Sequence, residues 1–128
     1  MKRATLFTLL IISSSLASAG PPKVTGLFSN MRFGTEDVTG VEIFITHSTS
    51  GYYVQVQCAE GEISRPVVVE ALVFGSLIEF SVPPKSDSNS YSCPTGKFKG
   101  IISAREIKGS FEGTNWPSIL KRQKSYWQ

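Results

Sequence analysis

Apolar and polar side chains alternate with a period of two residues along most of the chain after residue 24. This period is typical of β-strands, whose successive side chains point to opposite faces of a sheet. It is clearest over residues 67–82, where Gly75-Ser76 predicts a two-residue hairpin turn of type II′ that places Phe74 opposite Leu77. One face of this hairpin then holds only apolar side chains: Val67, Val69, Ala71, Val73, Ile78, Phe80 and Val82. A shift by one residue would bury two glutamates, so burial fixes the register.

A second hairpin is predicted with Ala104-Arg105 as its turn. Its facing pairs on the inner side are Ile102 with Ile107, Gly100 with Gly109, and Phe98 with Phe111. The two glycines leave a gap in an otherwise bulky face, and glycine inside a strand usually marks a bend or a close approach. We expect sharply curved strands or an aromatic ring packed over the gap, with a ligand slot as the alternative.

Further strands are predicted at the other alternating segments: residues 24–33, 41–46, 52–59 and 118–127, with a short one around residues 91–93. Residues 47–51 are interpreted as a hairpin loop. Many short strands joined by tight turns are typical of a barrel or a sandwich. We favour an all-β fold, a mainly up-and-down antiparallel β-barrel of about eight strands, because sequential hairpins dominate and closure removes exposed edges. A Greek-key β-sandwich is the alternative.

The first residues of the chain have the composition of a secretory signal peptide. Lys2 and Arg3 precede an apolar run over residues 6–12, and Ala17-Ser18-Ala19 matches the small-x-small pattern that signal peptidase cleaves. The run is shorter than the ~20 residues of a transmembrane helix, which disfavours a retained anchor. We predict a signal peptide over residues 1–19 and a single β domain over residues 20–128, with an amphipathic first helix as the alternative for the leader.

The predicted mature chain is nearly neutral. Removing Lys2 and Arg3 leaves 11 of the 13 Lys and Arg against 10 Asp and Glu. Proteins that bind nucleic acid concentrate Lys and Arg, because neutralising phosphates releases counterions; no nucleic-acid partner is expected. Lys97, Lys99 and Lys108 interrupt the outward apolar band that a membrane-spanning barrel needs, so no membrane span is expected in the mature form.

The two cysteines, Cys58 and Cys93, both lie in the predicted mature chain. An even count in an exported chain predicts a disulfide, which belongs to a secreted or periplasmic setting. The bridge would close a loop of about 36 residues and contribute roughly 4 kcal/mol in the chain-entropy model. A reactive thiol pair is the alternative, but the CxxC spacing that tunes thiol pKa values is missing.

The residue inventory gives little material for catalysis, metals or cofactors. His47 is the only histidine and lies in the predicted loop, and the chain has no Gly-x-Ser-x-Gly motif. Zinc needs three or four ligands, which one histidine and two bridged cysteines do not supply. Glu70 and Glu79 share the outward face of the first hairpin, where apolar neighbours would raise a carboxyl pKa. We predict a protein that is not an enzyme and has no cofactor, with a hydrolase using Glu70 and Glu79 as an alternative.

Recognition is the remaining class of function. Leu72, Phe74 and Leu77 point outward from the first hairpin, and Phe44 and Tyr53 are expected nearby. Large exposed apolar patches tend to be binding sites. We predict an exported binding protein that holds a protein partner or a small apolar ligand through this patch or through the barrel mouth. Alternatively, the C-terminal segment folds over the patch with its three aromatic side chains, Trp116, Tyr126 and Trp127.

Gly26-Leu27-Phe28 and Arg122 resemble the signature of calycin or lipocalin-type barrels. In that family an early Gly-x-aromatic element meets a basic residue near the last strand, and the aromatic residue is usually Trp where this chain has Phe28. The resemblance implies a small secreted barrel, a class that includes ligand carriers and periplasmic inhibitors of metalloproteases. Such inhibitors use an extended N-terminal segment, and Pro21 and Pro22 extend residues 20–23 here.

Overall fold

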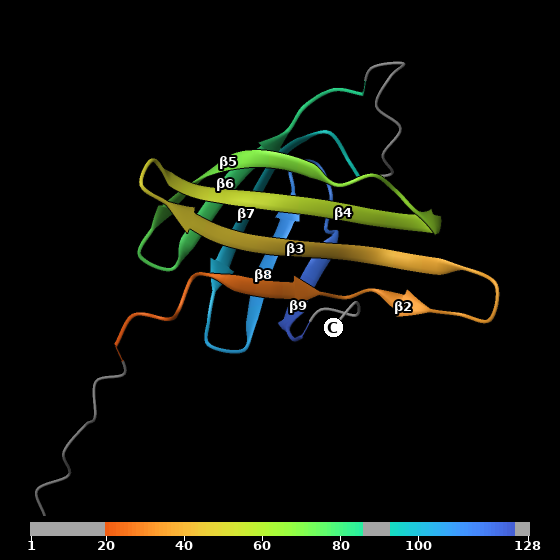
Figure 1. Cartoon of the computed structure of the whole chain (residues 1–128), viewed down its shortest axis with the longest axis horizontal. Coiled ribbons are helices and arrows are strands. Elements are labelled where there is room, and N and C mark those ends of the chain that lie inside the picture. The colour runs from red at the N-terminus through yellow and green to blue at the C-terminus, as the bar shows by residue number, and fades with distance from the viewer. Residues whose placement is uncertain (1–19, 86–92, 125–128) are drawn as a thin grey trace, which may run out of the picture.

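The computed structural model describes residues 20–85 and 93–124, which form antiparallel strands joined by short turns (Figure 1). The strands are β1 (Gly26–Ser29), β2 (Arg32–Phe33), β3 (Val38–Ser48), β4 (Gly51–Ile63), β5 (Val67–Phe74), β6 (Leu77–Val82), β7 (Gly96–Ile102), β8 (Glu106–Phe111) and β9 (Pro117–Arg122). The predicted signal peptide lies outside the described residues.

The strands close into an antiparallel barrel of eight strands. From β3 to β9 each strand pairs with the next one in sequence, and β1 pairs with both β3 and β9. The short β2 continues along the beginning of β3. The all-β, up-and-down barrel is therefore confirmed, and the sandwich alternative is excluded because β1 joins the two ends of the sheet.

Both predicted hairpin registers are confirmed. Phe74 faces Leu77 across the β5–β6 turn, where Gly75 has a φ of 61°, as a type II′ turn requires. In the β7–β8 hairpin Ile102 faces Ile107, and the two remaining predicted pairs follow in register. Side chains on the inner face of β6 are buried, so the apolar alternation points to the barrel interior as expected.

Several predicted boundaries are wrong. The N-terminal segment is split into β1 and β2, because Asn30 leaves the strand and its amide oxygen accepts a hydrogen bond from the Val41 N–H. The predicted loop at residues 47–51 is shorter: β3 runs to Ser48 and β4 starts at Gly51, so His47 lies in a strand. The last strand begins at Pro117 and ends at Arg122. Of the short strand expected around residues 91–93, only residue 93 is described, and it is not in a strand.

Apolar side chains fill the barrel interior. Phe80, Phe98 and Phe111 pack against one another, with ring centroids 4.8–6.4 Å apart. The Phe98 ring covers the glycine gap, since a Cβ on Gly109 would lie 2.7 Å from Phe98 Cζ and one on Gly100 2.9 Å from Phe98 Cε1. An aromatic ring over the gap is therefore the correct interpretation, and the space proposed as a ligand slot is occupied.

The predicted disulfide is present. Cys58 in β4 is bonded to Cys93, which precedes β7, and their Cα atoms are 5.1 Å apart. Both cysteines are buried within the hydrophobic core. The bond links β4, which precedes the β5–β6 hairpin in sequence, to the segment that leads into β7 after it.

Arg122 closes the barrel at the seam between β1 and β9. Its guanidinium carbon lies 4.3 Å from the centre of the Phe28 ring, and Phe28 and Arg122 are paired across the two strands. A Cβ on Gly26 would lie only 2.7 Å from Arg122 Nη1, so glycine leaves the room that the guanidinium occupies. Arg122 therefore lies against both of the other residues that carry the resemblance.

Candidate functional site

Exposed apolar side chains gather at the turn end of the β5–β6 hairpin. Phe74 is 85% exposed and Leu72 is 74% exposed, although both are large and apolar. The register places Phe74, Leu77 and Ile101 side by side across β5, β6 and β7, all facing outward. We call these four residues, Leu72, Phe74, Leu77 and Ile101, the apolar strip.

The row through the apolar strip continues around the barrel. Ile101 faces Lys108 on β8, and Lys108 faces the exposed Ile119 on β9. Sequence reasoning did not include Ile101 or Ile119 among the site residues. The signal for Ile101 was present, because it is the bulky apolar residue on the outward face of the β7–β8 hairpin. Ile119 is brought into line only by the pairing of β8 with β9.

Phe44 and Tyr53 do not join the apolar strip. Phe44 faces Gln55, which in turn faces Val68 on β5, so these residues form a separate row. Tyr53 faces Glu70, and its hydroxyl shares a 3.0 Å hydrogen bond with the Ser50 hydroxyl. Glu70 thus stands between the Val68 row and Leu72 along the outer face of β5.

Trp116 does not cover the apolar strip. Its ring stacks on Phe111 with centroids 6.0 Å apart and packs against the core. The other two aromatic residues of the covering segment, Tyr126 and Trp127, lie outside the described residues. Within the part of the chain that the structure describes, the apolar strip faces solvent.

Glu79 next to the apolar strip is paired with lysines. Its carboxylate lies 2.8 Å from Lys97 Nζ and 3.7 Å from Lys99 Nζ. The hydrogen bond from Lys97 lowers the pKa of Glu79 from its usual value. The expectation that apolar neighbours raise the pKa of this carboxyl is therefore wrong, and a general acid needs the opposite shift.

A pH-dependent contribution to stability follows from the lowered pKa of Glu79. A carboxyl whose pKa is lower in the folded state stabilises the fold above its unfolded pKa, and this stability is lost as the pH falls through the folded pKa. We expect Glu79→Gln to unfold at lower urea concentration than the wild type at pH 7, with the difference shrinking as the pH falls below the ordinary carboxyl pKa of 4.5 and disappearing below the lowered pKa of the folded state. Urea unfolding of both proteins at pH 7 and in acid measures the difference in stability. A difference that persists in acid would contradict the ion-pair explanation.

The remaining candidate group, His47, lies opposite Tyr52 in the β3–β4 hairpin. The His47 ring packs edge-on against Tyr52 with centroids 4.7 Å apart, and the Ser48 hydroxyl hydrogen-bonds to Ser50. Among the described residues, no three His, Cys, Asp or Glu side chains lie close enough together to hold a metal ion.

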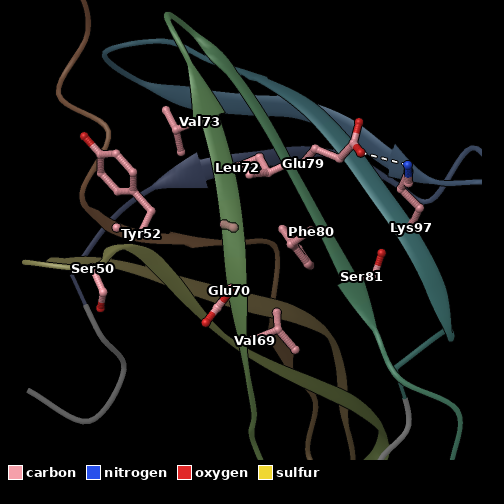
Figure 2. A pocket seen from close by; sticks show the side chains of 12 residues that line it. Ser50, Tyr52, Val69, Glu70, Leu72, Val73, Glu79, Phe80, Ser81 and Lys97 are labelled. Carbon is pink, nitrogen blue, oxygen red and sulfur yellow. Dashed lines mark ion pairs between the residues drawn. The ribbon is translucent and has the colours of Figure 1, made fainter.

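A pocket of about 610 Å³ opens beside β5 (Figure 2). Its apolar lining includes Val69, Val73 and Phe80, and its polar rim includes Glu70 and Ser81. Figure 2 shows that β5 and β6 separate at this place. The pocket is open at the side of the barrel.

Comparison with known proteins gives no relative: no family model, no curated protein and no solved structure matches the chain. No helix among residues 20–85 and 93–124 is long and apolar enough to cross a membrane.

Proposed function

We propose that this chain is an exported interaction protein that binds a partner protein through the apolar strip. The main observation in support is the exposure of Phe74, which a β-hairpin presents to solvent beside Leu72, Leu77 and Ile101. Exposed apolar surface of this kind is costly in water unless a partner covers it. The filled barrel interior supports recognition at the surface in preference to carriage of a ligand inside.

Export is supported by two features. The leader over residues 1–19 has the pattern of a signal peptide, and the disulfide between Cys58 and Cys93 is stable in an oxidising compartment. We therefore place the mature protein in the periplasm or outside the cell. The contacts among Gly26, Phe28 and Arg122 support the resemblance to lipocalin-type barrels.

Phe74→Asp is expected to abolish partner binding without unfolding the barrel, because it places a carboxylate at the most exposed position of the apolar strip. The measurement is recovery of partners on the tagged mature protein from the periplasm or medium of the producing cell. Phe44→Asp, a substitution of a half-exposed phenylalanine in a separate row, serves as the matched control and is expected to retain the partners. Equal recovery with wild type and Phe74→Asp would refute the assignment.

A protease inhibitor is the second candidate, favoured by one observation. Arg122 Nη1 donates a hydrogen bond of 2.8 Å to the Thr25 carbonyl, and Nη2 donates to the Lys23 carbonyl. The extended segment before Lys23 thus leaves the barrel from a fixed point (Figure 1). Deleting residues 20–22, which keeps the Lys23 anchor, is expected to relieve inhibition of a cosecreted metalloprotease. Absence of inhibition by the intact mature protein would dismiss this candidate.

A further inference from the structure

Strand β5 changes partners along its length. Its first half pairs with β4, from Val67 facing Val56 to Ala71 facing Tyr52. Its second half pairs with β6, from Ala71 facing Phe80 to Phe74 facing Leu77. Among the described residues, residues 67–70 of β5 therefore have a neighbouring strand on one side only, although β5 lies within a closed barrel. We call residues 67–70 the open edge.

Two prolines follow β6 at the place where it leaves the open edge. Continuing the β5–β6 register would place Pro83 opposite Val68 and Pro84 opposite Val67. Proline has no N–H to donate to a neighbouring strand. The prolines therefore disfavour pairing with residues 67–68, and the ladder ends earlier, at Ala71 and Phe80, beyond which β6 separates from β5 (Figure 2).

The open edge presents backbone hydrogen-bonding groups to solvent. Backbone groups of successive residues in a strand point alternately to its two sides. The type II′ turn makes Phe74 and Leu77 a hydrogen-bonded pair, so Val68 and Glu70 direct their N–H groups toward the side from which β6 has withdrawn. Val68 is 65% exposed. An exposed row of this kind is a template for pairing with another strand.

The surroundings of the open edge select the side chains of such a strand. Inward-facing positions of an added strand would meet the pocket of about 610 Å³, which is lined by Val69, Val73 and Phe80. Outward-facing positions would lie beside Glu70, whose carboxylate makes no ion pair with any described residue. Apolar side chains fit the first environment and a basic side chain fits the second.

We propose that the open edge binds an extended segment of a partner polypeptide in which apolar residues alternate with a basic residue. The segment adds to β5 as a strand, its apolar side chains enter the pocket, and its Lys or Arg pairs with Glu70. The open edge lies at the end of β5 away from Phe74, although Leu72 of the apolar strip also lines the pocket, so the tests below alter Val68 and Glu70 rather than Leu72.

The first test measures whether the edge is open in the free mature protein. Val69 directs its N–H toward β4, whereas Val68 directs its N–H toward the gap. We expect the Val68 amide to exchange with solvent deuterium at least about tenfold faster than the Val69 amide. Equal protection of the two amides would show that the edge is already covered, which would overturn the proposal.

The second test uses a designed probe, acetyl-Thr-Val-Arg-Val-Thr-amide, titrated into the labelled protein by NMR. Its valines are placed to enter the pocket and its arginine to meet Glu70. Methylating the backbone nitrogen of the arginine residue removes a hydrogen bond to β5, and we expect binding to weaken about tenfold or more. Methylating the nitrogen of the second valine, which points away from β5, is the matched control and is expected to matter less. Equal loss from the two methylated probes, or no binding by the parent probe, would overturn the proposal.

Variants of the protein test the backbone contact and the charge contact separately. Val68→Pro removes the free N–H and leaves the β4 ladder intact, so we expect it to fold and to lose the probe, whereas Val68→Thr keeps the N–H and retains the probe. We expect the wild type to prefer the arginine probe over a probe with glutamate in place of arginine. Glu70→Lys is expected to reverse this preference. An unchanged preference would refute the role of Glu70 even if Val68→Pro failed to fold. Phe74→Asp, which tests the apolar strip, is expected to bind the probe normally.

Discussion

Replacing Arg122 with methionine is expected to lower the free energy of unfolding by about 2–4 kcal/mol, because several charge-assisted hydrogen bonds and a cation–π contact are lost together. The guanidinium donates to the Ala104 carbonyl at 2.9 Å and to the Thr25 carbonyl at 2.8 Å. It also lies over the Phe28 ring. Burial lowers the pKa of Arg122, which shows that the charge is partly removed from water. Methionine fills similar space but leaves the partly buried Thr25 carbonyl oxygen without its donor.

Arg122→Lys separates charge from geometry in the same experiment. An ammonium keeps the positive charge but cannot reach carbonyls on both the N-terminal segment and the β7–β8 turn with the planar fork of a guanidinium. We expect Arg122→Lys to recover less than half of the loss, measured by urea unfolding. Lys124→Met, an exposed substitution two residues further on, is the control. If Arg122→Met and Lys124→Met unfold at the same urea concentration, the closing role of Arg122 is wrong.

Removing the disulfide with Cys58→Ala and Cys93→Ala together is expected to destabilise the protein by about 4 kcal/mol in the chain-entropy model. The two cysteines are 35 residues apart in sequence, and the bond restricts the unfolded chain over that length. A typical domain has only about 5–15 kcal/mol of stability, so the loss is a large fraction of the total. Both side chains are buried, and alanine also leaves two small cavities.

Reduction of the wild-type protein provides the matching measurement. Urea unfolding with and without dithiothreitol is expected to show the shift in the wild type and no shift in the double alanine variant. A wild-type midpoint that does not respond to reductant would contradict the structural role of the bond.

The sequence predicted most of the fold, because each hairpin carries its own register. The alternation around Gly75 could be satisfied with apolar side chains inward in one register only, and the same holds for the pairing of Phe98 with Phe111. These relations are local, and they require only that one face be buried. The loop around His47 was misplaced because its polar residues suit an exposed strand end as well as a turn.

The candidate site was predicted less completely, because outward neighbours depend on how strands line up around the barrel. Leu72, Phe74 and Leu77 belong to one hairpin, so its register alone makes them neighbours, whereas Phe44 lies in another row. Ile119 reaches the row of the apolar strip only through β8. Strand β6 ends at Val82, directly before two prolines, but the effect of this ending on β5 depends on the strand on the other side.

The β1–β9 seam also sets the order in which this barrel completes itself. Arg122 and Thr25, which meet there, are 97 residues apart, whereas most strands find their partner in the next segment of chain. As the polypeptide emerges from a ribosome or a translocation channel, successive hairpins form from local sequence and β1 can pair with β3, while the other edge of β1 has no partner until the last strand is made. A premature stop a few codons before Arg122 would consequently release a nearly full-length chain whose sheet stays open at the β1–β9 seam. Such a sheet would be vulnerable to proteases and to aggregation.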